Sequence, residues 1–417
     1  MINKNETPKK IIACLLIYSH VLVGCVTTGG QSNVIQAGPR ASSSYNEEAI
    51  EAVAVGPKLD VIIPVFDPGL TGNAESYEEQ GIWPELRRAE ANRFAYKMKE
   101  ALDKSNAFGA VRVTPDETAS GDLYVLGKIE ASDGEEVKIK LNVVDISGKQ
   151  WLNESFKHEV DDSFYKNIRN DGKDAYTPVF QEATDDIIAA LKKRDATELD
   201  NLKDIADLRF GASFNDAAFE EYMTTESNYI KLVSKPSDDD PLLQRVMAVR
   251  VREQLFVDNL QQNYTSFSQN MDDSYLKWQE ASFTEMQLRR DAQTEGTLKA
   301  LGGILLIGLA IAAAVSSTNT SNPSVTREST LATAAVAGGV AGAWLLSGSF
   351  KSKEEAEFHQ DAINELGESI NLELAPRVVS FENETVELTG NIQEQFAQWR
   401  EFLKRIYEQE ATPNTAI

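Results

Sequence analysis

Cysteine and histidine are the residues that this sequence has least of. Its 417 residues include two cysteines, Cys14 and Cys25, and three histidines, His20, His158 and His359. Because both cysteines lie near the N-terminus, no disulfide can join distant parts of the chain. Beyond residue 25 there is no thiol nucleophile, and two histidines are too few for a metal site built on His and Cys. Cysteine chemistry and zinc-type sites are therefore excluded from most of the chain.

Positive charge is also in short supply. The chain has 41 Lys and Arg against 65 Asp and Glu, which gives a formal net charge of −24 and a pI near 4.6. Proteins that hold nucleic acid need a basic face for the phosphates, so we expect no nucleic-acid partner. An acidic surface chiefly keeps a protein soluble and points to no particular ligand.

Patterns that carry catalysis are missing as well. Carboxylates cluster at 78–79, 135–136 and 238–240, but each cluster lies at an expected turn or helix start, where solvated side chains are typical. The Gly302-Gly303 pair is not followed by the lysine of a phosphate-binding loop. We therefore expect no enzyme activity, no cofactor and no metal site. A hydrolase with carboxylates assembled across domains is kept only as a third reading.

The longest apolar stretch lies in the last third of the chain. Leu298 to Val315 and Leu331 to Ser347 are apolar runs, and the loop between them, Ser316 to Thr330, is rich in Ser, Thr and Asn. Eighteen residues of helix extend about 27 Å, close to the hydrocarbon thickness of a bilayer. Residues 298–349 are therefore predicted to form a helical hairpin, either of transmembrane helices or buried in the core of a helical bundle or oligomer.

Glycine and alanine dominate this apolar hairpin. Its second run holds six alanines and three glycines among seventeen residues, so it is only weakly hydrophobic. Small residues allow helices to approach closely, as in the GxxxG pair Gly338 and Gly342. The glycines that we expect at the packed surfaces are Gly302, Gly303, Gly308, Gly338, Gly339 and Gly342. Such a segment is suited to packing against other helices, which favours a homo-oligomer.

The N-terminus has the layout of a secretory signal. Lysines at positions 4, 9 and 10 precede an apolar stretch from Ile11 to Val23, which ends in Leu22-Val23-Gly24-Cys25. This ending resembles the lipobox of bacterial lipoproteins. The resemblance implies that residues 1–24 are a lipoprotein signal peptide and that Cys25 becomes the lipidated N-terminus, with acyl chains such as palmitate. An ordinary signal peptide with an incidental cysteine is the alternative.

The same resemblance implies a place in the cell envelope. Val26, and not an aspartate, follows Cys25, which in enteric-type sorting implies an outer-membrane lipid anchor with the bulk of the chain in the periplasm. A hairpin inserted in the inner membrane would leave its flanking basic residues, Arg289, Arg290 and Lys351 among them, outside, against the positive-inside bias. The outer membrane therefore suits the hairpin better.

Residues 25–57, rich in Gly, Ser, Ala and Asn, are predicted to be a flexible tether, and an α/β periplasmic domain follows at 59–195. Apolar residues alternate along short strands and recur at three and four along helices, which gives the order β-α-β-β-β and one further helix. The strands are expected at 59–66, 108–113, 123–131, 137–143 and from 151 onward, and the helices at 84–102 and 176–191.

This order resembles a group of small periplasmic domains. They occur in the curli secretion channel lipoprotein, the Pel polysaccharide export lipoprotein, the penicillin-binding-protein activator lipoproteins and the N-terminal domain of the Tol-Pal propeller protein. The residues that carry the resemblance are Val61 to Phe66, Asn106 to Val113, Asp122 to Ile129 and Asp145 to Gly148. Because members assemble into rings or dock on envelope partners, the resemblance implies a protein that is not an enzyme and that has envelope protein partners.

Helices are predicted for much of the remaining chain. Residues 196–297 are expected to form short helices, broken at Gly211 and at Pro236-Ser237-Asp238, and then a long stalk helix that leads into the apolar hairpin. A return helix follows at 350–376. His359 on this helix is interpreted as a packed or partly exposed stalk residue rather than a ligand.

The last segment, residues 377–417, is predicted to form a small β-hairpin and a C-terminal amphipathic helix. Asn391 and Glu394 have the spacing of a capping box at the start of that helix. The stripe of Trp and Phe along it belongs either to the core or to a contact with a neighbouring subunit.

Three functions are consistent with these features. The first is an outer-membrane lipoprotein that binds membrane lipid, oligomerises, and serves as a structural, pore-like or anchoring component of an envelope export or surface machine. The second is a monomeric periplasmic activator or binding lipoprotein with the hairpin buried. The third is the carboxylate hydrolase already mentioned.

Overall fold

The computed structural model describes residues 56–70, 77, 82–294, 353–381 and 384–409. These residues form a mixed α+β protein with a small sheet, several helices and one long helix, which confirms the α+β class. The predicted signal peptide, the tether up to residue 55 and the apolar hairpin lie outside the described residues.

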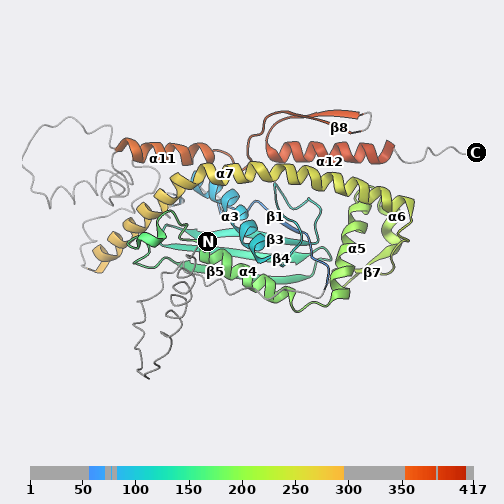
Figure 1. Ribbon diagram of the computed structural model, residues 1–417, viewed down its shortest axis with the longest axis horizontal. Helices are drawn as coiled ribbons and strands as arrows, with labels where there is room; N and C mark the ends of the chain where they lie inside the picture. Colours follow the sequence, from blue (N-terminus) through green and yellow to red (C-terminus); the bar gives the residue numbers. More distant parts are fainter. Residues whose placement is uncertain (1–55, 71–76, 78–81, 295–352, 382–383, 410–417) are drawn as a thin grey trace, which may run out of the picture. The chain divides into compact units, whose positions relative to one another are not determined.

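The helices and strands follow one another along the chain as in Figure 1. Their bounds are β1 Val61–Pro64, α3 Pro84–Ser105, β2 Val111–Thr114, β3 Leu123–Ser132, β4 Glu136–Asp145, β5 Gln150–Glu159, η2 Ile168–Asn170, α4 Thr177–Leu191, α5 Ala196–Ala212, α6 Asp216–Phe219, η3 Glu220–Tyr222, β6 Met223–Glu226, β7 Tyr229–Leu232, α7 Pro241–Thr294, α11 Lys353–Leu366, β8 Arg377–Phe381, β9 Glu384–Leu388 and α12 Ile392–Gln409.

The main sheet has five strands in the order β2-β1-β3-β4-β5. Strand β1 is parallel to both of its neighbours, whereas β3, β4 and β5 form an antiparallel meander. Asp133 and Gly134 make the turn between β3 and β4. The Asp133 carboxylate accepts hydrogen bonds from the amides of Glu135 and Glu136, and Gly134 supplies a φ of 92° that other residues rarely adopt.

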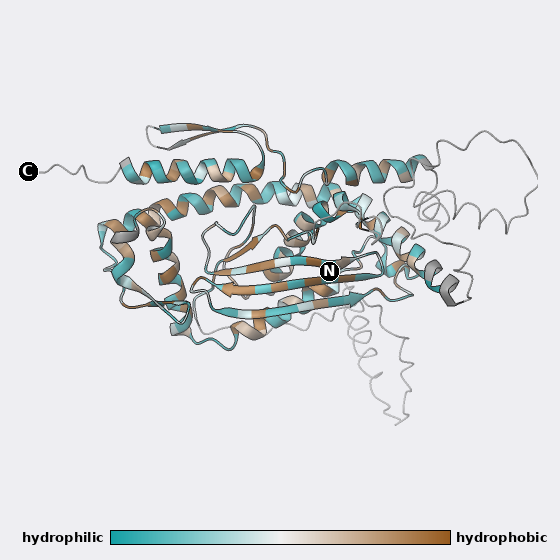
Figure 2. Ribbon diagram, turned by 180° about the vertical axis from the view of Figure 1, so that it is seen from behind, coloured by the Kyte–Doolittle hydropathy of each residue, from teal (hydrophilic) through white to brown (hydrophobic). Residues whose placement is uncertain are grey.

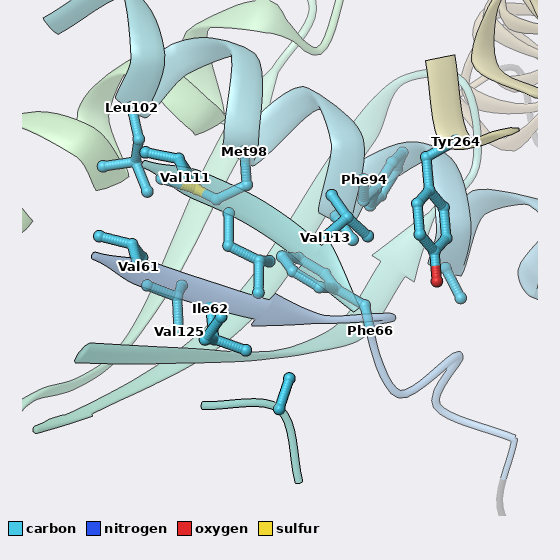
Figure 3. Close-up of a cluster of buried hydrophobic side chains, with 14 of the residues drawn as sticks. Val61, Ile62, Phe66, Phe94, Met98, Leu102, Val111, Val113, Val125 and Tyr264 are labelled. Atoms are coloured by element: carbon cyan, nitrogen blue, oxygen red, sulfur yellow. The ribbon is translucent and has the colours of Figure 1, made fainter. Parts of the chain in front are cut away.

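Helices α3 and α4 pack on one face of this sheet (Figure 1). The apolar residues of the long strands alternate with polar ones, as the brown and teal bands on the strands show in Figure 2, so that one face is buried. Figure 3 shows Phe66, Phe94 and Val113 converging between the sheet and α3, with Tyr264 of α7 beside them. All four of these side chains are at most 1% exposed. The core therefore includes α7 as well as the sheet and its helices.

Helix α7 has 54 residues and begins where Asp240 caps it, since the Asp240 carboxylate accepts hydrogen bonds from the amides of Leu242 and Leu243. It crosses the edge strand β2. There the side-chain amide of Gln261 accepts from the Val113 N–H and donates to the Val113 carbonyl, both at 2.9 Å. These two bonds replace the strand partner that β2 lacks on this side. The predicted stalk helix is therefore packed along the α/β body over much of its length.

The chain between α4 and α7 agrees with the prediction only in part. The expected break at Gly211 falls one residue before the end of α5 at Ala212, and the absence of a side chain at Gly211 makes room for the Phe219 ring. A β-hairpin, β6 and β7, occupies residues that were predicted to be helical. Its turn consists of Ser227 and Asn228, both with positive φ, and no glycine marks it.

The C-terminal residues fold onto α7. The capping box is confirmed, since the Asn391 N–H donates to Glu394 Oε2 and the Glu394 N–H donates to Asn391 Oδ1, both at 3.0 Å. The aromatic stripe of α12 is buried within the chain, with Phe396 and Trp399 stacked on Phe256 of α7. Of the two interpretations of this stripe, the structure favours the core.

Within the described ranges, no helix combines the length and the apolarity that a membrane span needs.

Candidate functional site

Two adjoining cavities lie where the loop between β5 and α4 meets α7. Their volumes are about 600 and 520 Å³, within the range of small-molecule sites. They share the lining residues Gly172, Lys173, Asp273 and Leu276. We refer to the two cavities together as the α7 cleft.

The loop that forms one wall of the α7 cleft is held in place by its own side chains. The Asp161 carboxylate accepts from the N–H and hydroxyl of Ser163, and these bonds lower the pKa of Asp161. The Asn170 amide donates to the Phe164 carbonyl at 3.1 Å, and Phe164 is fully buried. The Tyr165 ring, at 4.9 Å from that of Phe164, lines the first cavity. The cleft is therefore preformed.

A buried arginine forms the floor of the second cavity. Arg93 of α3 has a side chain that is 1% exposed, yet it lines the cavity. Its guanidinium pairs with Asp174 at 2.9 Å and with Asp272, and lies 4.5 Å from the centre of the Tyr275 ring. Burial opposes ionisation of Asp174, but Arg93 and a hydrogen bond from Gln279 outweigh it, so that its pKa is lowered. These contacts join α3, the loop and α7 at one point.

A buried carboxyl group lies one turn away on α3. Glu90 is fully buried and accepts hydrogen bonds from the hydroxyls of Ser132 and Tyr275. Burial raises its pKa to about 7, although Arg87, at 3.8 Å, and Arg93 act in the opposite direction. Glu90 lines neither cavity of the cleft. It therefore acts as a structural link between α3, β3 and α7.

The lining of the α7 cleft carries both signs of charge in equal number. Three basic and three acidic side chains line each cavity: Lys166, Lys173, Lys277, Asp171, Asp273 and Glu280 in the first, and Arg93, Lys97, Lys173, Asp174, Asp272 and Asp273 in the second. Among the described residues, Lys166 and Lys173 have no salt-bridge partner. A cleft of this composition suits a ligand that itself carries both an amine and a carboxylate.

His359 contributes to the cleft from α11. Its Nδ1 lies 2.9 Å from the Ser274 hydroxyl, and its ring lines the first cavity. Burial lowers the pKa of His359, and Lys277 adds to this effect while Glu355 and Asp273 oppose it. A ring placed between helices in this way has the packed position that was predicted, and it also borders the cleft. In the part of the chain that the structure describes, no group of His, Cys, Asp or Glu is arranged to hold a metal ion.

The site residues predicted from sequence lie outside the described residues. This applies to Cys25 and to the six hairpin glycines at 302, 303, 308, 338, 339 and 342. Of the carboxylate clusters, Glu135 pairs with Arg290 at 2.7 Å and Glu136 with Lys157 at 2.8 Å, while Asp240 caps α7. These carboxylates therefore have structural partners.

Sequence reasoning did not find the cleft. Its buried pair, Arg93 and Asp174, is separated by 81 residues, so no local pattern joins the two. A weak signal was present in α3, where Arg87, Glu90 and Arg93 recur every third residue beside the apolar stripe. A charged row of that spacing usually indicates an exposed, ion-paired helix face, so the sequence did not show that these side chains are buried.

Comparisons with known proteins found no match: no family model matches the chain, and neither the curated proteins nor the solved structures contain a significant relative.

Proposed function

We propose that this protein is a lipid-anchored component of the bacterial outer membrane with structural or anchoring work in an envelope export or surface machine. The sequence support is the lipobox-like Leu22 to Cys25 and the two apolar runs of 298–349. The lipid anchor would attach to the flexible N-terminal tether, and the apolar hairpin would provide a second membrane or helix-packing element. The mature body would then lie in the periplasm.

The observation that carries this proposal is the way α7 is joined to the body. It ends at Thr294, shortly before the apolar run that starts at Leu298. Along its length it is tied to the body by Arg112 with Asp258 at 2.5 Å and by Arg250 with Asp122 at 3.3 Å. A helix fixed in this way would, in this proposal, carry displacement of the apolar segment to the body, as an anchoring or assembling component requires.

The finer architecture belongs to the same proposal. We propose that residues 59–195 are a β-α-β-β-β periplasmic domain of the group named above and that residues 298–349 are a helical hairpin. The motif Asp122 to Ile129 supports the first part, because Asp122 and Gly127 each have a structural reason at their position. Domains of that group dock on envelope partners, and we propose the same of this chain.

Labelling of intact cells tests the proposal. Single cysteines are placed by Thr320→Cys and Ser324→Cys in a Cys14→Ala background, with Lys404→Cys on the exposed face of α12 as the matched periplasmic control. A membrane-impermeant maleimide should label positions 320 and 324 from outside while position 404 stays protected. Labelling of all three positions only after the outer membrane is permeabilised would overturn the surface-reaching hairpin.

A second test addresses the lipid anchor. Cys25→Ser removes the thiol to which the acyl chains would be attached, so the chain should no longer be acylated, and mass spectrometry of the N-terminal peptide would report the difference. An unmodified Cys25 in the parent chain contradicts the lipoprotein proposal.

The α7 cleft favours one alternative, a monomeric periplasmic activator or binding lipoprotein. Its preformed volume and balanced charges suit a small ligand. Titration of the parent chain with short peptides that carry both amines and carboxylates, against Lys173→Glu, would show binding that the substitution weakens if this alternative holds. Absence of binding to the parent chain removes the support that the cleft gives it.

A further inference from the structure

The exposed face of α7 is almost free of charge. Between residues 241 and 270 its exposed residues are Pro241, Gln244, Met247, Ala248, Val251, Leu255, Asp258, Asn259, Gln262, Gln269 and Asn270. The charged side chains along it are Asp258, which is paired with Arg112 at 2.5 Å, and the half-exposed Arg252, whose guanidinium donates to the Ala248 carbonyl at 2.7 Å. Thirty residues of helix extend about 45 Å, so a long strip with few charges and no net charge runs along the surface. We call it the neutral face of α7.

Other exposed helix faces in this chain are charged. On α12 the exposed residues are Gln393, Glu394, Ala397, Glu401, Lys404, Arg405 and Glu408, five of which carry a charge. A chain with a net charge of −24 usually places charge wherever a helix meets solvent. The neutral face therefore differs from the charged exposed face of α12, and this difference calls for a physical explanation.

The part of the neutral face at residues 247–255 is apolar. Met247, Val251 and Leu255 are spaced by four residues, and they are 45, 52 and 56% exposed. Large apolar side chains in a row on one helix face are typical of a helix–helix contact. Ala248 between them is small and lets a second helix approach closely.

The chemistry of the face indicates which partner covers it. Two copies of a strongly acidic chain repel each other, so a surface without net charge is the one along which they meet with the least repulsion. The part of the face at residues 259–270 carries the side-chain amides of Asn259, Gln262 and Gln269. An amide has both donors and an acceptor and can pair with a copy of itself, whereas Lys or Glu would face its own like charge.

We propose that a second copy of this chain packs on the neutral face, with the two α7 helices side by side and running in the same direction. This arrangement sets the apolar residues of one copy against those of the other and the amides against the amides, along the full strip. The opposite direction would set Met247 and Val251 against amides if the whole strip were used. This interface specifies how copies of the chain assemble, and it rests only on the assembly part of the proposed function. The contact between the two helices itself needs no membrane.

The first experiment measures self-association of the full chain in detergent by sedimentation velocity. Val251→Lys places like charges opposite each other at the interface, and it should weaken self-association at least tenfold. Ala397→Lys makes the same change of charge on the exposed face of α12 and should leave self-association unchanged. Lysine suits an exposed helical position, and the melting temperature of each variant checks that the fold is kept.

Mixing provides the decisive readout. Chains with Val251→Lys and chains with Val251→Glu should each be impaired alone and associate with each other when mixed, because opposite charges then meet. A parent chain that is monomeric at tens of micromolar, or an oligomer that Val251→Lys leaves intact, overturns the proposal.

Cross-linking tests the direction of the two helices. In a Cys14→Ala, Cys25→Ser chain, Gln262→Cys should form a disulfide-linked dimer under mild oxidation. When the whole strip 241–270 is used, residue 262 meets its own copy only if the helices run in the same direction, because an antiparallel pair would be centred near residue 255. Gln393→Cys on α12 is the matched control and should stay monomeric. Equal cross-linking of the two variants overturns the same-direction interface. Failure here would leave acylation of Cys25 and labelling at residue 320 unaffected, so the two proposals can fail separately.

Discussion

At the scale of single residues, the positions that carried the resemblance prove to be junctions of the fold. Asp122 is fully buried and accepts hydrogen bonds from the Asp60 N–H at 2.8 Å, from Lys203 at 3.0 Å and from Arg250 at 3.3 Å. It thereby joins β1, α5 and α7 at the start of β3. Substitution of this carboxylate would leave Lys203 without its partner and remove one of the two carboxylates that pair with Arg250, which makes Asp122 a structural position.

Gly127 is the second residue of the Asp122 to Ile129 motif whose identity has a physical reason. A Cβ at this position would lie 2.4 Å from the Phe66 ring, so Gly127→Ala must displace the ring and should cost about 1–3 kcal/mol in the free energy of unfolding. Urea denaturation measures it. The cost should shrink in a Phe66→Leu background, because the smaller side chain leaves room. An equal cost in both backgrounds would show that Phe66 is not the cause.

Glu90 makes the stability of the fold depend on pH. Its folded pKa of about 7 lies above its ordinary value of 4.5, so the folded chain binds more protons between these two values. Stability is then highest below pH 4.5 for this group and falls as pH rises through 7, by about 3 kcal/mol. Glu90→Gln keeps hydrogen-bonding atoms but cannot ionise, and it should gain stability relative to the parent chain by about that amount between pH 4.5 and 8.

Urea unfolding at several pH values checks the Glu90 prediction. Glu401→Gln removes one carboxylate from the exposed face of α12 and serves as the control for net charge alone. Parallel pH profiles for the parent chain and Glu90→Gln would contradict the prediction.

At the scale of elements, the long helix and the C-terminal capping box were predictable because their signals are local. Leu260, Tyr264, Phe267 and Met271 repeat at three and four residues, and all are buried. The strands β6 and β7 were missed because each has only four residues, and β6 is also polar and mostly exposed. Gly211 lies next to the end of α5, as predicted, and it also has a tertiary reason that no local pattern shows: the Phe219 ring needs the space that a side chain would fill.

The edge of β2 provides a test at the same scale. Gln261→Leu removes both hydrogen bonds to Val113 and leaves its N–H and carbonyl unpaired, which should cost about 2 kcal/mol in the free energy of unfolding. Hydrogen exchange at the Val113 amide should become faster.

Gln261→Glu separates the two bonds. Its carboxylate still accepts from the Val113 N–H but has no donor for the Val113 carbonyl, which it faces. We therefore expect Gln261→Glu to lower the free energy of unfolding of the parent chain as well. Gln393→Leu on the exposed face of α12 is the control for adding an apolar side chain. Unchanged exchange at Val113 in Gln261→Leu would contradict the role given to Gln261.

At the scale of the whole molecule, the charge of −24 sets conditions for assembly. Salt screens repulsion between exposed charges, so the proposed dimer should be tighter at about 0.5 M than at about 0.05 M NaCl, by at least about threefold. Sedimentation velocity at the two concentrations measures this. Weaker association at high salt would point instead to an interface held by ion pairs.

The α7 cleft shows what sequence reasoning could not reach at this scale. Its lining comes from α3, the loop before α4, α7 and α11, which are far apart in the chain. Charge, composition and apolar spacing predict which residues are buried, but they do not predict which distant elements meet. The proposed apolar hairpin and the proposed lipidation of Cys25, by contrast, depend on local patterns, and for them the proposals stand on the sequence.

The cover that α7 gives to β2 also sets an order of events during folding. Val113 and Gln261 are 148 residues apart, Arg93 and Asp272 are 179 apart, and Trp83 bonds to Asn364 across 281 residues. Until the segment around Gln261 is available, β2 has an open edge that can pair with the strands of other chains. Folding of this chain therefore passes through a vulnerable interval, and a chaperone that shields that edge would raise its yield.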